Sequence, residues 1–225
     1  MHGHLSSLIY ADANTELTAI QDIPAIQRRR LSPLAKIALH TAKTVLQQHH
    51  GEIDYIVWSS CYGDEHTTLS IMQDIAQEEL PSPAQFSTSV HNAISGLYSI
   101  LFQDNTPATS LSSMPHHSWQ DALLEAYSYL QIHHKKNALI VYYDAPLPEV
   151  YQIVDKHHHN IQTTHIHAIS AILSLDKPAN LSMQFKSMNQ PHDEPQAKAF
   201  YDFWYSEQQQ WQSQAWIFEK HDSQN

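Results

Sequence analysis

The chain has one cysteine and only four glycines among its 225 residues. A single cysteine, Cys61, cannot form an internal disulfide and is typical of proteins in a reducing compartment. The glycines Gly3, Gly51, Gly63 and Gly96 lie too far apart to build a glycine-rich phosphate loop. P-loop and dinucleotide-binding fingerprints are therefore excluded.

Basic residues and long apolar runs are also scarce. The chain has 23 acidic against 12 basic residues, a formal net charge of −11, which argues against binding to nucleic acid or anionic membranes. No apolar run approaches the ~20 residues of a membrane span, and the first residues lack the basic start of a signal peptide. We expect a cytoplasmic protein.

The main basic cluster is Arg28–Arg30, followed by Lys36. Adjacent arginines of this kind usually form a solvated corner, and that interpretation is favoured here. The alternative is a docking site for an acidic partner.

Helical and strand-like segments alternate along the chain. Ser32 and Pro33 form a helix start, and Gly51 is expected to end that helix. Ile53–Ser60 is rich in β-branched and aromatic residues. We expect helices at 33–50, 65–80, 86–101, 119–133 and 195–205, and strands at 5–11, 53–60, 108–113, 137–143, 165–175 and 214–219. In strand 165–175 apolar and polar residues alternate, which predicts that one face of the strand is exposed to solvent. Segment 176–195 has the composition of a surface loop. This order predicts one layered α/β domain over 1–225, with a core at 5–175 and a C-terminal helix and edge-strand extension at 176–225.

Two possible catalytic arrangements are weak. Cys61 follows a strand and has His66 five residues later, which would suit a Cys/His nucleophile, although a lone cysteine there is more often a small buried hydrophobe. A Ser/His hydrolase built from Ser110, Ser112 or Ser113 with His116 would need a G-x-S-x-G elbow, which the sequence lacks.

The 18 histidines form no zinc-binding motif. His165 and His167 would share a face of their strand and could form an adventitious metal site with the 157–159 run. A surface biased toward glutamine and histidine is the favoured interpretation. We expect no metal and no cofactor.

Four segments resemble the N-terminal half of β-ketoacyl synthases. They are IQRRRLSPLAKIALHTA (26–42), IVWSSCYGDEHTTLSIMQDI (56–75), FSTSVHNAISGLYSI (86–100) and NALIVYYDAPLPEVY (137–151). More closely, they look like the short β-ketoacyl-synthase-like chain length factors of aryl polyene gene clusters. The resemblance implies a thiolase-like half, α/β/α with a central mixed sheet, truncated relative to a full ketosynthase.

The resemblance also implies that the chain is not itself an enzyme. The synthase's nucleophilic cysteine begins the helix after strand 108–113, and this position falls here on Pro115 or His116. The catalytic histidine pair belongs to the second half of a synthase. A synthase without its thiol cannot form an acyl thioester.

The implied function is that of an inactive chain length factor. It would form a heterodimer with a full-length β-ketoacyl-ACP synthase, meet the acyl carrier protein only indirectly, and support or limit elongation of the acyl (polyene) chain. The residues expected at the partner interface or acyl tunnel are Val90, Asn92, Ala93, Ile94, Thr109, Leu111 and Ser113. The alternatives are a homodimeric acyl-binding or scaffold protein and a Cys/His-dependent acyl-transfer enzyme.

Overall fold

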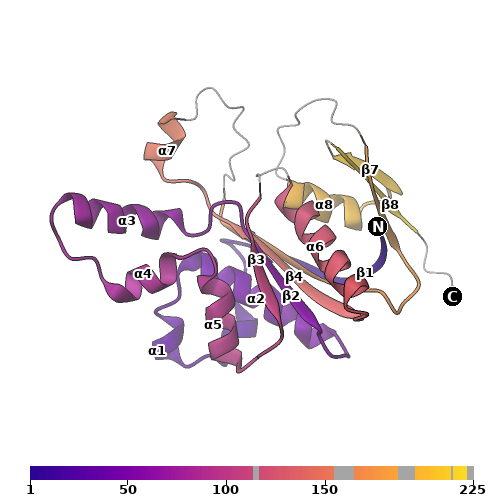
Figure 1. The fold of residues 1–225 in the computed structure, drawn as a ribbon, viewed down its shortest axis with the longest axis horizontal. Helices are drawn as coiled ribbons and strands as arrows, with labels where there is room; N and C mark the ends of the chain where they lie inside the picture. The colour runs from indigo at the N-terminus through magenta and orange to yellow at the C-terminus, as the bar shows by residue number, and fades with distance from the viewer. Residues whose placement is uncertain (114–116, 155–164, 187–195, 214, 222–225) are drawn as a thin grey trace.

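The computed structural model describes residues 1–113, 117–154, 165–186, 196–213 and 215–221. In these ranges the chain forms a mixed eight-stranded sheet of order β3-β2-β4-β5-β1-β6-β8-β7 (Figure 1). The strands are β1 (His2–Asp12), β2 (Tyr55–Ser59), β3 (Ala108–Leu111), β4 (Asn137–Asp144), β5 (His167–Ser174), β6 (Leu181–Phe185), β7 (Gln210–Ser213) and β8 (Trp216–Lys220). β2 runs parallel to β3 and β4, and the other pairings are antiparallel.

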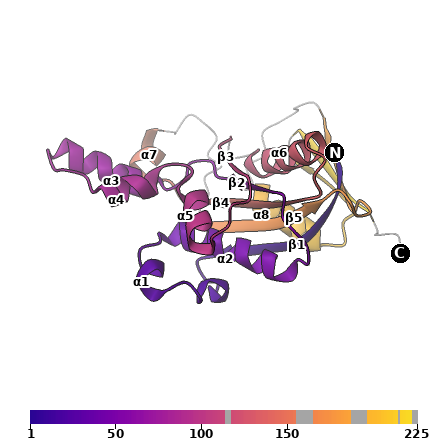
Figure 2. The ribbon, with the colours of Figure 1, turned by 60° about the horizontal axis from the view of Figure 1, so that its bottom comes forward.

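Helices cover both faces of this sheet. They are η1 (Thr18–Ile20), α1 (Ala25–Arg28), α2 (Pro33–Gln48), α3 (Glu65–Ala76), α4 (Pro83–Ser89), α5 (Ala93–Phe102), α6 (Ser118–Ile132), α7 (Glu149–Val154) and α8 (Gln196–Tyr205). Figure 2 shows α2 and α5 on one side of the sheet and α6 on the other. The expected α/β/α arrangement around a central mixed sheet is confirmed. Within the described ranges, no helix combines the length and apolar character of a membrane span.

The sheet separates two apolar cores because neighbouring side chains of β2 point to opposite faces. Tyr55 and Val57 join the core under α6 and α8, whereas Ile56 and Trp58 join the core under α2 and α5. On that second face, α2 begins as predicted, with the Ser32 side chain accepting a hydrogen bond from the amide of Ala35 at 3.2 Å.

Helix α2 ends earlier than predicted. It stops at Gln48, and His49 takes an extended conformation. Gly51 is not among the residues with positive φ in the described chain, so it is not a left-handed cap. The helix therefore ends without the predicted glycine stop.

The expected single helix over 86–101 is wrong. The chain forms α4 and α5 instead, separated at Val90, whose backbone is extended (φ −66°, ψ 146°). In α4 the hydroxyls of Ser87, Thr88 and Ser89 donate to main-chain carbonyl oxygens three or four residues earlier. Such bonds compete with continued helix and favour a bend or an end.

The exposed face expected for strand 165–175 is also wrong, because β5 is buried along its whole length. It pairs with β4 on one side and with β1 on the other. The polar residues His167, Ser170 and Ser174 are buried with the rest, and the Ser170 hydroxyl donates to that of Thr41 at 2.7 Å. Ser174 likewise donates to the side-chain oxygen of Asn137 at 2.7 Å, so both serines that suggested solvent are satisfied inside the protein, whereas Nε2 of His167 has no partner among the described residues.

The C-terminal part contains a strand that the sequence did not indicate. β6 lies inside the stretch expected to be a surface loop, and it pairs with β1 and β8. Helix α8 and strand β8 occur where the helix at 195–205 and the strand at 214–219 were predicted. The edge of the sheet on this side is β7, however, and β8 lies between β6 and β7.

Candidate partner interface

Strand β3 lies at one end of the sheet order and carries two of the predicted interface residues. It pairs with β2, with Val57 opposite Thr109 and Ser59 opposite Leu111. No strand is paired to its other side within the described ranges. Thr109 and Leu111 share the face covered by α6, where Leu111 packs against the core. Such an unpaired edge is a template for a strand of another chain.

Ser113, a third predicted residue, stabilises the start of α6. Its hydroxyl donates to a carboxylate oxygen of Asp121, in the first helical turn. The Ser118 hydroxyl in turn donates to the carbonyl oxygen of Ser113 at 3.2 Å. Pro115 and His116 lie outside the described residues.

The other four predicted residues lie at the break between α4 and α5, on the opposite face from Thr109. Asn92 is exposed, Val90 is 40% exposed and Ala93 is half-buried. Ile94 is 6% exposed because it packs into the chain's own core. Val90, Asn92 and Ala93 therefore lie at one surface, whereas the side chain of Ile94 is part of the apolar core.

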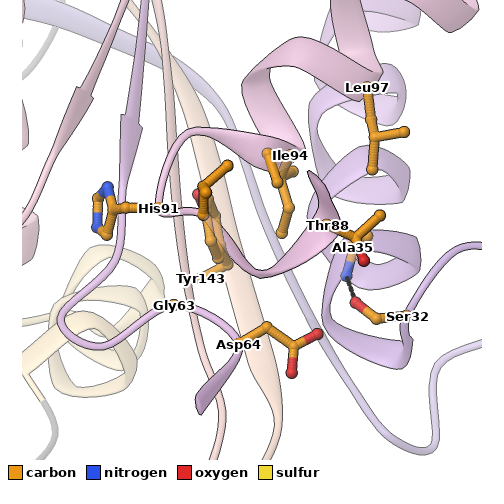
Figure 3. A pocket seen from close by; sticks show the side chains of 11 residues that line it. Ser32, Ala35, Gly63, Asp64, Thr88, His91, Ile94, Leu97 and Tyr143 are labelled. Carbon is orange, nitrogen blue, oxygen red and sulfur yellow. Dashed lines mark hydrogen bonds between the residues drawn. The ribbon is translucent and has the colours of Figure 1, made fainter. Parts of the chain in front are cut away.

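A small cavity lies behind this break, next to the first turn of α2 and the loop after β2 (Figure 3). It is lined by Ser32, Ala35, Gly63, Asp64, Thr88, Val90, His91, Ala93, Ile94, Leu97 and Tyr143. The space for the centre of a water-sized sphere is about 10 Å³, close to the least that holds one water molecule. This cavity cannot hold an acyl chain.

The loop after β2 is fixed by a buried carboxylate, Asp144, at the end of β4. This group accepts hydrogen bonds from the Ser60 hydroxyl at 3.0 Å, the Cys61 amide at 3.2 Å and the Tyr142 hydroxyl at 2.7 Å. Burial raises the pKa of the Asp144 carboxyl, although these donors and the nearby His167 act to lower it. This role of Asp144 was not predicted from the sequence, because a single aspartate after a strand is common.

Cys61 in this loop is unsuited to nucleophilic catalysis. Burial and the adjacent Asp144 raise the pKa of its thiol to about 12, so very little of the reactive thiolate forms near neutral pH. The ring Nε2 of His66 lies 3.1 Å from the carbonyl oxygen of Pro146. These contacts argue against the Cys/His alternative.

The histidines form no metal centre in the described part of the chain, where no group of three or more potential ligands is arranged to hold an ion. His167 is buried between the rings of Tyr10 and Tyr142. His165 precedes β5 and is exposed, so the two do not share a strand face. The 157–159 run lies outside the described residues.

The arginine cluster is divided between two roles. Arg28 is half-buried, and its guanidinium donates to the carbonyl oxygen of Gln21 at 2.8 Å and to that of Ile23 at 3.3 Å. Arg29 and Arg30 are exposed. Arg28 thus stabilises the preceding loop of the fold, whereas Arg29 and Arg30 are in contact with solvent.

The chain belongs to the β-ketoacyl synthase family, because the family described as "Beta-ketoacyl synthase, N-terminal domain" matches residues 6–222. The thiolase-like half expected from the resemblance is thereby confirmed. A comparison with curated proteins gives no match.

Among solved structures, the chain is similar to one in "Ketosynthase (ApeO) in Complex with its Chain Length Factor (ApeC)" from Xenorhabdus doucetiae. The TM-score is 0.83 at 22% identity, over 98% of this chain and 100% of that one. It is also similar to "The ishigamide ketosynthase/chain length factor" (TM-score 0.58, 10% identity, 77% of this chain and 54% of that one).

A third similar structure is a β-ketoacyl synthase from Burkholderia phymatum (TM-score 0.54, 10% identity, 76% of this chain and 52% of that one). The chain therefore spans about half the length of the last two proteins, and all of the matched chain in the first. At these identities the likenesses establish the fold.

Proposed function

We propose that this chain is a catalytically inactive chain length factor that pairs with an active β-ketoacyl-ACP synthase. In the pair, the synthase performs the condensation on the carrier-bound acyl chain, and this subunit supports or limits the length of the product. The polyene type of product follows from the sequence resemblance. A cytoplasmic location agrees with the single free cysteine.

The observation that carries this proposal is the combination of an inert thiol with a cavity too small for substrate. The only cysteine in the sequence, Cys61, has a pKa raised to about 12. The cavity next to the predicted tunnel residues has room for about one water molecule. In the proposed pair, the second chain supplies both the nucleophile and the acyl tunnel.

The unpaired edge of β3 is where the second chain would join. A strand of the synthase would extend the sheet there, and Thr109, Leu111 and the α4–α5 break would lie beside the joint. Ala93 is the position best placed to affect product length, because its small side chain is half-buried at this surface. Ile94 is less suitable, since a larger residue there would overpack the chain's own core.

The test is co-expression of the chain with the full-length ketosynthase, followed by sizing of the complex and an elongation assay. We expect a one-to-one complex, and activity or product length that changes when this chain is left out. Ala93→Phe should shift the product toward shorter chains without preventing assembly. Cys61→Ser is the matched control and should leave elongation unchanged.

Three outcomes would contradict the proposal. A synthase with the same activity and products without this chain would show that it has no role in elongation. A stable lone homodimer that ignores the synthase would favour the scaffold alternative. Loss of elongation in Cys61→Ser would favour the Cys/His enzyme.

A further inference from the structure

His91 lies in the break between α4 and α5, directly after Val90 and two residues before Ala93. Its side chain is partly buried, whereas that of Val90 is 40% exposed. The ring Nε2 of His91 lies 3.2 Å from the carbonyl oxygen of Ser60, the residue that follows β2. Because a carbonyl oxygen can only accept a hydrogen bond, Nε2 carries the hydrogen in this contact. His91 therefore connects the break to the end of an inner strand of the sheet.

Ser60 is fully buried, and its other polar groups are engaged as well. Its amide donates to the carbonyl oxygen of Leu111 at 3.1 Å. Its hydroxyl donates to the carboxylate of Asp144 at 3.0 Å and accepts from the Gly63 amide at 2.8 Å. A residue held through both its main chain and its side chain cannot shift without breaking several buried hydrogen bonds. The carbonyl group of Ser60 is therefore a rigid attachment point for His91.

The loop after β2 and the break also meet at the small cavity, which Gly63 and Asp64 of the loop line together with Thr88 and His91 (Figure 3). A Cβ built on Gly63 would lie 3.8 Å from Cδ2 of His91, an ordinary van der Waals distance. Gly63 has a φ of 72°, a conformation that favours glycine. The imidazole of His91 thus packs beside a loop whose shape is already fixed.

The two sides of the break are held in different ways. On the α5 side, Ile94 is 6% exposed and packs in the apolar core. On the α4 side, α3 and α4 project from the body of the molecule, and within the described ranges α3 packs mainly against α4 (Figures 1 and 2). Val90 lies between these two sides and has no polar side chain of its own. Its position relative to the sheet therefore depends on the hydrogen bond of His91.

Building on the proposed function, we infer that His91 is a positioning residue for product length, which through Ser60 holds Val90 and Ala93 at one fixed place on the surface that meets the acyl tunnel. His91 itself takes no part in the condensation. A wall discriminates between chain lengths only when its side chains are held in place by the residues around them. Without the hydrogen bond to Ser60, the break can shift relative to β2, and the selection of one chain length becomes less sharp.

The test compares His91→Leu, which cannot donate to the Ser60 carbonyl oxygen, with His91→Gln, whose side-chain amide can. Each variant is co-expressed with the full-length ketosynthase, the complex is sized, and the elongation products are separated by chain length. We expect both variants to assemble. In His91→Leu the ratio of the main product to its neighbours in length should fall by about 3- to 10-fold, the range that corresponds to the loss of one hydrogen bond. His91→Gln should keep the wild-type ratio.

Hydrogen exchange of the free subunit tests the structural step separately. The amides of residues 60–64 and 88–93 should exchange faster in His91→Leu than in the wild type or in His91→Gln. The amides of β5, which is buried along its whole length, should exchange at the same rate in all three.

His50→Leu is the matched control, because His50 is exposed and precedes β2, at the opposite end of that strand from Ser60. It should leave the product ratio and the exchange rates unchanged. If the wild-type chain does not bind the synthase, or does not change its products, the proposed function and this inference both fall. If the wild type controls product length, three results overturn only the inference: an unchanged ratio in His91→Leu, loss of assembly in His91→Leu, or an equal fall of the ratio in His91→Gln.

Discussion

Cys61 and Asp144 illustrate how burial controls reactivity at single residues. The carboxylate accepts the Cys61 amide hydrogen bond at 3.2 Å, and both groups are withdrawn from solvent. A negative group beside a thiol disfavours the thiolate, as does removal from water. The pKa of Cys61 is therefore raised to about 12, in the opposite direction from that of a catalytic cysteine.

We predict that iodoacetamide alkylates Cys61 in the folded protein at pH 8 at least ~100-fold more slowly than in the unfolded chain. The reason is the smaller thiolate fraction at the raised pKa, together with limited access. Mass spectrometry of samples quenched over time, with and without urea, gives the two rates. Equal rates would show that the thiol is accessible and ionised, and would return the Cys/His enzyme to consideration.

The stability of the folded chain depends on pH through the buried residue His40. It is buried in α2, and its Nδ1 accepts a hydrogen bond from the Ala19 amide at 3.3 Å, which requires this nitrogen to be unprotonated. Burial lowers the pKa of His40 below its ordinary value of 6.5. The unfolded chain therefore takes up a proton that the folded chain does not, and stability contributed by the neutral ring is lost as pH falls through 6.5.

We predict that the free energy of unfolding decreases between pH 7.5 and pH 5.5, and that it decreases less in His40→Asn. Asparagine places an acceptor oxygen near the position of Nδ1 but does not titrate. Urea denaturation at the two pH values measures the difference, with His221→Gln as the control at an exposed histidine. Contributions of other groups, including the opposite one from Asp144, cancel in the comparison. If the free energy of unfolding falls by the same amount between the two pH values in His40→Asn as in the wild type, His40 is not a source of the pH dependence.

The predicted interface residues show which features of single residues can be predicted from the sequence and which cannot. Resemblance selected the segment 90–94 as a unit, and the structure places Val90, Asn92 and Ala93 at the surface. It could not separate Ile94 from them, because burial depends on how α5 packs against α2 and β2. Asp144 was not selected, since its importance comes from contacts with residues more than 80 positions away.

At the scale of elements, local signals located most helices but not their ends. The Ser-Pro start of α2 is encoded locally, and Ser32 accepts the expected capping hydrogen bond. Ser82 caps α4 in the same way, although no helix start was predicted there. β6 was missed because its strand form depends on pairing with β1 and β8 rather than on its own alternation. β5 is buried on both faces because α2 covers one face of it and α6 and α8 cover the other, which the local sequence does not reveal.

The residue that ends α5, Gln103, has an unfavourable backbone conformation that can be tested by substitution. Gln103, its C-cap, has φ 52° and ψ 38°, a left-handed conformation that favours glycine. We predict that Gln103→Gly increases the free energy of unfolding by about 0.5–1 kcal/mol, measured by urea denaturation. Gln73→Gly, in the interior of α3, is the matched control and should lose about 1 kcal/mol. A loss of stability in both variants would mean that the Gln103 side chain outweighs its backbone strain.

At the scale of the whole molecule, the order of the sheet links the two ends of the chain. β1 lies between β5 and β6, so the N-terminal strand connects the parallel-strand region to the C-terminal hairpin. The terminal ammonium group donates to the carbonyl oxygen of Met183 at 2.9 Å. Alternating helices and strands predicted the layered class, but the antiparallel insertion of β1 follows only from long-range pairing.

Helices α3 and α4, with the residues between them, form the α3–α4 arm, residues 65–89. Figures 1 and 2 both show α3 and α4 projecting from the body of the molecule. The side chains of Met72, Ile75, Leu80 and Phe86 on or between these helices are 55%, 58%, 97% and 60% exposed. Apolar side chains gathered on one projecting segment favour association with another surface.

We predict that the chain expressed without a partner self-associates through this arm, and that the double variant Leu80→Ser, Phe86→Ser raises the concentration at which light scattering detects association. Because both side chains are already exposed, the free energy of unfolding should change by less than about 0.5 kcal/mol. Ile132→Ser is the matched control, since Ile132 is 72% exposed on α6, away from the arm. Removing it should leave association unchanged. If the control reduces association as much as the double variant, general surface hydrophobicity, and not the arm, drives the self-association.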